Sequence, residues 1–194
     1  MKLNKLIITI LLAQAFIYSC TKSPYDKLVS NESSKSLVLD SLVFDFHFGD
    51  SKSHFFKRCK ELNKKEIIKE GPNNKYVQYI LKTTHENESP VQMLFYGSFD
   101  ENKIMTGMDF LFSYNYWSPL SDDYSAQKLM PQLKDTLMNW YPGNDFIPIK
   151  ILNQETDAFV KVDANRQILM YTKDSKDVIV KIEDLRTKYP SKYK

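Results

Sequence analysis

The stretch VQMLFYGSFDENKIMTGMDFLFSYNYW, from Val91 to Trp117, decides the fold that we predict for this chain. Two runs rich in apolar and aromatic residues flank the polar segment DENK, which is typical of a turn. A third run of this kind, KYVQYILKTT, begins at Lys75 and is followed by the polar segment HENESP. Consecutive strands that are joined by short turns pair in antiparallel fashion, so the sequence predicts an antiparallel meander.

A segment with helical periodicity precedes these strands. In HFFKRCKEL, the residues Phe55, Cys59 and Leu62 share one helical face, which predicts a helix over about 51–63. Either Asp50 or Ser51 is placed to cap its first turn.

The second half of the chain repeats this order of elements. A helix is expected over about 123–141, and Pro131 either kinks it or marks its true first turn. One side of this helix carries Leu129, Met130, Leu133, Leu137 and Trp140. Four apolar strand segments follow, which are FIPIKIL, DAFVKV, RQILMYT and DVIVKI, and the charged tail from Glu183 is expected to end in one helical turn.

The predicted fold class is therefore α+β, with helices packed on one face of an antiparallel sheet. The repeated order of elements suggests two tandem helix-plus-strands units. This order resembles small tandem helix-plus-sheet domains, such as the protein inhibitor of β-lactamase and a small lipoprotein of the outer-membrane assembly machinery. The resemblance implies a shared architecture and carries no function with it.

One further strand is expected before the first helix. In SLVFDFHFGD, the residues Phe44, Phe46 and Phe48 alternate with Asp45 and His47. An alternation with a period of two predicts a half-buried strand whose polar side chains face water.

The amino terminus, MKLNKLIITILLAQAFIYSC, combines two lysines with an apolar run that ends at Ser19 and Cys20. The run is shorter than the roughly 20 apolar residues that cross a bilayer, and it predicts a secretory signal peptide. The segment FIYSC resembles the lipobox of bacterial lipoproteins, with Ile17 and Ser19 at its defining positions. The resemblance implies that Cys20 receives a diacylglycerol thioether, that the preceding peptide bond is cut, and that the new amino terminus is acylated.

These features predict a signal peptide at 1–19, a flexible polar tether at 20–36 and a single α+β domain at 37–194. Thr21 follows the cysteine where lipoproteins of the inner membrane usually carry Asp, so the resemblance favours the outer membrane. An acidic segment for surface export is also missing, which favours the periplasmic side.

Composition limits the function further. The formal net charge is +3, and both Lys2 and Lys5 belong to the predicted signal, so we expect no nucleic acid partner. The five glycines form no phosphate-binding loop, and we expect no cofactor. With Cys20 lipidated, Cys59 has no disulfide partner and is expected to pack as a small apolar residue.

Two groups of residues are candidate sites. The first group ends an aromatic strand and consists of Tyr114, Tyr116 and Trp117. Their rings are suited to stacking on a glycan or small ligand. Alternatively, the aromatic strand belongs to the core and its tyrosine rings lie at the solvent-exposed edge of the sheet. Asp45, His47 and His54 are of the types that bind metal or transfer protons, in which case the protein is a metal-dependent hydrolase. Alternatively, these residues belong to the polar face of a strand and the first turn of a helix, and have no catalytic or metal-binding role.

Because the chain lacks a full catalytic set, we expect a non-catalytic protein. The leading hypothesis is a lipid-anchored envelope lipoprotein whose domain binds or scaffolds another envelope component. Its partners are then the membrane, through the lipid on Cys20, and an unidentified envelope protein or glycan.

Overall fold

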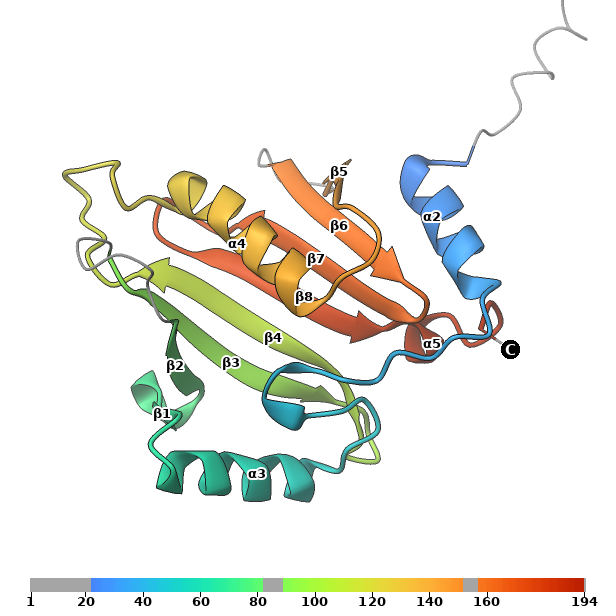
Figure 1. Cartoon of the computed structure of the whole chain (residues 1–194), viewed down its shortest axis with the longest axis horizontal. Coiled ribbons are helices and arrows are strands. Elements are labelled where there is room, and N and C mark those ends of the chain that lie inside the picture. The colour runs from blue at the N-terminus through green and yellow to red at the C-terminus, as the bar shows by residue number, and fades with distance from the viewer. Residues whose placement is uncertain (1–21, 82–88, 152–156, 194) are drawn as a thin grey trace, which may run out of the picture.

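One eight-stranded antiparallel sheet organises the molecule (Figure 1). The computed structural model describes residues 22–81, 89–151 and 157–193. The strands, in chain order, are β1 (Lys69–Glu70), β2 (Val77–Leu81), β3 (Val91–Phe99), β4 (Met105–Tyr114), β5 (Ile147–Lys150), β6 (Asp157–Asp163), β7 (Arg166–Thr172) and β8 (Val178–Asp184). Their order across the sheet is β1-β2-β3-β4-β8-β7-β6-β5, which confirms the predicted α+β class and antiparallel sheet.

The hairpin predicted at the start of the sequence forms as β3 and β4. Phe95 lies opposite Phe110, and Phe110 in turn lies opposite Val180 on β8, so one face of these strands is continuously apolar. At the turn, the Asp100 carboxylate accepts a hydrogen bond of 2.8 Å from the Ile104 amide. Pairing of β4 with β8 joins the two meanders into a single sheet.

The two predicted helices form at the expected places. Helix α3 spans Lys52–Lys64, and the Ser51 hydroxyl caps it by accepting a 3.1 Å hydrogen bond from the His54 amide. Helix α4 spans Ala126–Trp140 and buries its predicted apolar side against the sheet. Pro131 lies inside α4 and is exposed, so it does not mark the first turn. A short helix, α5 (Leu185–Lys188), forms in the charged tail as expected.

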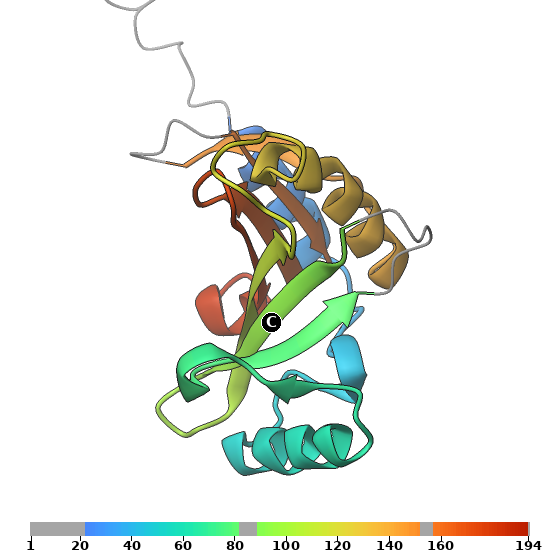
Figure 2. The same ribbon diagram turned by 90° about the vertical axis from the view of Figure 1, so that its left-hand side faces the viewer.

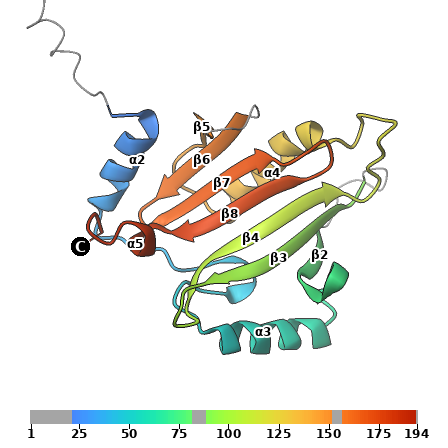
Figure 3. The same cartoon turned by 180° about the vertical axis from the view of Figure 1, so that it is seen from behind.

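The predicted packing of all helices on one face of the sheet is not confirmed, because α4 and a further helix lie on opposite sides of β6. Lys161 and Phe159 of β6 point toward α4, where they contact Met138 and Lys134. The alternate residues of β6 pack instead in a second apolar cluster with Val29, which belongs to a further helix, α2 (Pro24–Ser33). Figure 1 shows α4 in front of β7 and β8, Figure 2 shows α4 to one side of the sheet, and Figure 3 shows the other face of these two strands with no helix in front of it.

Helix α2 also corrects the predicted tether, because part of 20–36 is folded. Ser23 caps it, Pro24 begins it, and Val29 is buried against the sheet. The prediction failed because the segment has only one fully buried apolar residue, and its other buried residue is Glu32. The predicted signal peptide at 1–19, Cys20 and Thr21 lie outside the described residues.

The predicted strand over SLVFDFHFGD is also wrong. A 3-10 turn, η1 (Val43–Asp45), forms there, with main-chain φ angles of +59° at Phe44 and +63° at Asp45. Two successive left-handed residues cannot continue a strand. Phe46 and Phe48 are nevertheless buried.

A second 3-10 turn, η2 (Pro72–Asn74), precedes β2. Each meander of four strands follows one helix in the chain, α3 for the first and α4 for the second. Within the described ranges, no helix is long and apolar enough to cross a membrane.

Candidate functional site

The described part of the chain contains an open cleft of about 720 Å³. It lies where the segment after α2 meets the end of α4 and the turn between β6 and β7. A volume of this size falls in the range of small-molecule sites. Its lining residues are Glu32, Lys35, Leu37, Leu39, Ser41, Leu42, Val43, Phe44, Tyr79, Trp140, Tyr141, Pro142, Gly143, Asn144, Asp163, Ala164 and Arg166.

The end of helix α4 places two aromatic rings at the cleft. Trp140 is the last helical residue and is half-buried, whereas Tyr141 is the C-cap and is buried. The Tyr141 hydroxyl accepts a hydrogen bond of 3.0 Å from the Val43 amide, which fixes the segment after α2 against the helix end. Burial raises the pKa of Tyr141 to about 12, so the hydroxyl stays protonated at neutral pH.

Arg166, the first residue of β7, is the buried cation of the cleft. It is 6% exposed, and its guanidinium carbon lies 4.5 Å from the centre of the Tyr141 ring. One nitrogen, Nη1, donates a 3.2 Å hydrogen bond to the Ser41 carbonyl, while the buried Nε has no partner. Burial lowers the pKa of Arg166, although the nearby Tyr141 and Asp163 oppose this effect.

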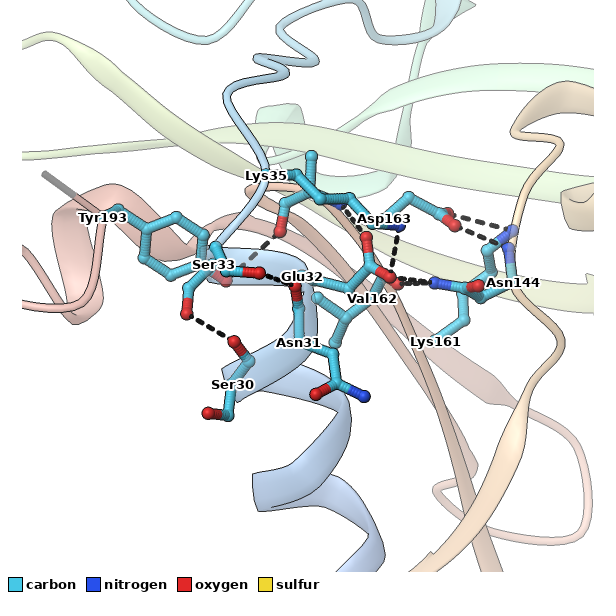
Figure 4. Close-up of polar contacts among 12 residues, drawn as sticks. Ser30, Asn31, Glu32, Ser33, Lys35, Asn144, Lys161, Val162, Asp163 and Tyr193 are labelled. Atoms are coloured by element: carbon cyan, nitrogen blue, oxygen red, sulfur yellow. Dashed lines mark hydrogen bonds and ion pairs between the residues drawn. The ribbon is translucent and has the colours of Figure 1, made fainter.

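A second polar group ties α2 to the loop after α4 (Figure 4). One oxygen of the buried Glu32 carboxylate accepts 2.7 Å contacts from Lys35 Nζ and Asn144 Nδ2, and the other accepts a 2.8 Å bond from the Ala164 amide. Burial alone would raise the Glu32 pKa, but these donors outweigh it and lower the pKa below its ordinary value.

Asp163 connects this group to a buried lysine. Its Oδ1 accepts a 2.7 Å bond from the Asn144 amide, and its Oδ2 lies 3.1 Å from Nζ of Lys161, which is fully buried. Gly143 passes directly over this carboxylate with a φ of +145°, and a Cβ there would lie 2.1 Å from Oδ1. The tight turn YPGN therefore requires glycine.

The mouth of the cleft contains the left-handed residue Phe44. Its ring packs edge-on to Tyr79 at 5.1 Å and stacks on Phe95 at 5.4 Å. The Phe44 carbonyl accepts a 3.0 Å bond from Arg58 Nε on α3. A positive φ is costly for a large aromatic residue, and such strain is concentrated at functional sites.

The predicted aromatic site lies away from the cleft. Tyr114 and Tyr116 both pack edge-on against Tyr124, at 5.3 Å and 6.1 Å, and Tyr114 also donates a 2.9 Å hydrogen bond to Gln132. Tyr116 is exposed, and Lys176 lies 5.5 Å from the centre of the Trp117 ring. The tyrosine rings therefore meet Tyr124 at steep angles, and the use of Tyr114, Tyr116 and Trp117 by a glycan or small ligand stays a prediction.

The predicted metal or acid–base residues gather around Asp50. His54 Nδ1 lies 2.9 Å from the Asp50 carboxylate, whereas His47 lies 4.0 Å from it and 4.0 Å from Asp45. Asp50 also accepts a 2.8 Å bond from the His47 amide, which is a structural use. Among the residues that the structure describes, no three histidine, cysteine or acidic side chains are grouped to hold a metal ion.

Cys59 of α3 is half-buried beside the main core, and burial raises its pKa to about 12.

The sequence alone does not predict the cleft, because the residues of the cleft come from four separate segments. In the sequence, Arg166 is only the first residue of the predicted strand RQILMYT. The one signal in the sequence was its position after the turn DAN, where a cation opens an otherwise apolar strand.

Comparisons with family models, curated proteins and solved structures found no match to this chain.

Proposed function

We propose that this chain is a lipid-anchored protein of the bacterial envelope that binds a ligand in the cleft around Arg166 and performs no catalysis. The observation that carries the binding role is the cleft itself, which combines aromatic walls with a buried cation in about 720 Å³. A site of this kind is suited to holding a molecule, because its rings supply contact area and its cation supplies orientation.

The state of the two carboxylates supports the non-catalytic part of the proposal. Glu32 is held by Lys35, Asn144 and the Ala164 amide, and Asp163 is held by Lys161 and the Asn144 amide. At Glu32 these donors lower the pKa below its ordinary value, so this carboxylate is a poor proton acceptor.

The lipid anchor rests on the order Ile17, Ser19 and Cys20 after a short apolar run. Two or three acyl chains hold a protein firmly on a bilayer, whereas one binds only marginally. Mass spectrometry of the membrane fraction should find Cys20 as a lipidated amino terminus, and Cys20→Ala should release the protein from membranes washed with carbonate. An unmodified Cys20 with the leader attached would refute the anchor.

We test the binding role by extracting the protein from its membrane and identifying what it releases on denaturation. Ser41 is exposed and lines the cleft, so Ser41→Trp should fill the site and reduce the released compound at least tenfold. Ser53→Trp on α3 is the matched control, because Ser53 is exposed and outside the cleft. Equal release from both variants, or no compound from the unmodified chain, would contradict the proposal.

We also infer that the chain consists of two tandem units, α3 with β1–β4 and α4 with β5–β8, which meet at the β4–β8 pair. The mirrored strand order supports this division. If it is right, cutting the chain in the exposed loop at 118–123 should leave two fragments that remain associated and refold together after denaturation. Fragments that never reassociate would count against tandem units.

A further inference from the structure

Among the described residues, Arg166 is the cleft cation that no carboxylate pairs with directly, although Asp163 is near enough to favour its charged form. The two lysines of this region are both paired with a carboxylate. Lys35 lies 2.7 Å from Glu32, and Lys161 lies 3.1 Å from Asp163. In the described part of the chain, the Arg166 guanidinium joins no ion pair, and the one hydrogen bond that it donates goes to the Ser41 carbonyl. A buried charge without a counter-ion is costly, so an anion that reaches it gains an unusually favourable partner.

The guanidinium is also fixed in place before any ligand arrives. Its carbon lies over the Tyr141 ring, 4.5 Å from the ring centre, and Nη1 donates a hydrogen bond to the Ser41 carbonyl. A planar guanidinium that is already oriented loses little entropy when it binds a carboxylate, which matches its geometry through two parallel hydrogen bonds.

The cleft also has an apolar wall. Leu37 and Leu39 of the segment after α2, together with Phe44, Tyr79 and Trp140, form walls beside the cation. Leu37 is 56% exposed, so the wall is an open apolar surface. A ligand that covers it removes apolar area from water, which favours an occupant with a hydrocarbon or aryl body.

We propose that the cleft binds an amphiphilic monocarboxylate, with its carboxylate on Arg166 and its apolar body against Trp140, Phe44 and Leu37. This assignment rests on the proposed binding function and adds the chemical class of the ligand. Among the described residues, one cleft cation has no directly paired carboxylate, and it matches a single negative charge. A phosphate monoester dianion would leave one charge unmatched beside Glu32 and Asp163, which also line the cleft.

The test uses Trp140 as the reporter, since the chain has two tryptophans and Trp117 lies outside the cleft. The full chain carrying Trp117→Phe is kept in dodecyl maltoside and titrated with 8-phenyloctanoate. Three probes with the same body but another head group are 8-phenyloctanol, 8-phenyloctylamine and 8-phenyloctyl phosphate at pH 8, where the phosphate carries two charges. The carboxylate should change Trp140 fluorescence with an affinity at least about tenfold higher than each other probe.

Arg166→Met should remove this preference, so that carboxylate and alcohol bind within about threefold of each other, while Arg166→Lys should retain part of it. Substitution of Arg166 also removes its hydrogen bond to the Ser41 carbonyl. The comparison of the four head groups on the cleft that retains Arg166 therefore tests the ligand class without any Arg166 variant. Equal affinity for carboxylate and alcohol, tighter binding of phosphate, or no fluorescence change with any probe overturns the ligand class. The binding function itself is tested separately, and it fails when Ser41→Trp and Ser53→Trp release equal amounts of the bound compound.

Discussion

Replacing Gly143 by alanine should destabilise the protein much more than the same change at Gly49. Both glycines have a left-handed φ, +145° and +93°, so an alanine is strained at either position. A left-handed conformation costs a residue with a Cβ about 1–2 kcal/mol. At Gly49 nothing lies within 4 Å of the added Cβ, so Gly49→Ala measures this strain alone.

At Gly143 the added Cβ would lie 2.1 Å from Asp163 Oδ1 and 2.7 Å from its Cγ. The carboxylate has to retreat by roughly 1 Å, which breaks its 2.7 Å bond to the Asn144 amide. A hydrogen bond to a charged group contributes about 1.5–3 kcal/mol. Gly143→Ala should therefore lower the free energy of unfolding by about 3–5 kcal/mol, against about 1–2 kcal/mol for Gly49→Ala.

Urea unfolding, followed by far-ultraviolet circular dichroism, measures both variants against the parent chain. The difference between them isolates the contact with Asp163. Two variants of equal stability would refute the argument that the YPGN turn is built around this carboxylate.

Three further changes test other parts of the structure. Asp163→Asn leaves the fully buried Lys161 without its counter-ion and should lower the free energy of unfolding in urea by about 3–5 kcal/mol. Adding Lys161→Met should restore part of this loss. If the effects of the two substitutions are additive, the pairing is contradicted. The Glu32 pKa is lowered in the folded state, so the ionised carboxylate stabilises the fold fully above about pH 4.5, and this stabilisation is lost as the pH falls through the folded pKa. The melting temperature should therefore fall more steeply with acid in the parent chain than in Glu32→Gln. Parallel curves for the two chains would count against this role of Glu32. Burial raises the pKa of Cys59 to about 12, so iodoacetamide at pH 8 should alkylate it far more slowly in the folded chain than in urea, and equal rates would show an accessible thiol.

The sheet was predictable because its signal is local. Phe110 and Phe112 are two residues apart, which places both on the core face of a strand, and DENK places the turn. The helix faces were predictable for the same reason, since Leu129, Leu133 and Leu137 repeat at helical spacing.

The cleft was not predictable because its chemistry is assembled by long-range contacts. Arg166 meets Ser41 across the fold, and Glu32 meets Asn144 and Ala164 in the same way. Nothing in the local pattern of SNESSKS indicates that Glu32 is buried. The strand expected at Phe44 does not form for a related reason. Arg58 donates a hydrogen bond to the Phe44 carbonyl, and the Val43 amide donates one to the Tyr141 hydroxyl, so long-range contacts hold this segment in a turn that its alternation does not favour.

The two tryptophans allow the most direct test of the binding site. Trp140 lies in the cleft and Trp117 lies in the loop after β4, so the ¹⁵N-labelled full chain gives one indole N–H signal for each. When 8-phenyloctanoate is added, the Trp140 signal should shift and the Trp117 signal should stay in place. A shift of Trp117 with Trp140 unchanged would place the ligand at the aromatic loop and contradict the assignment of the cleft.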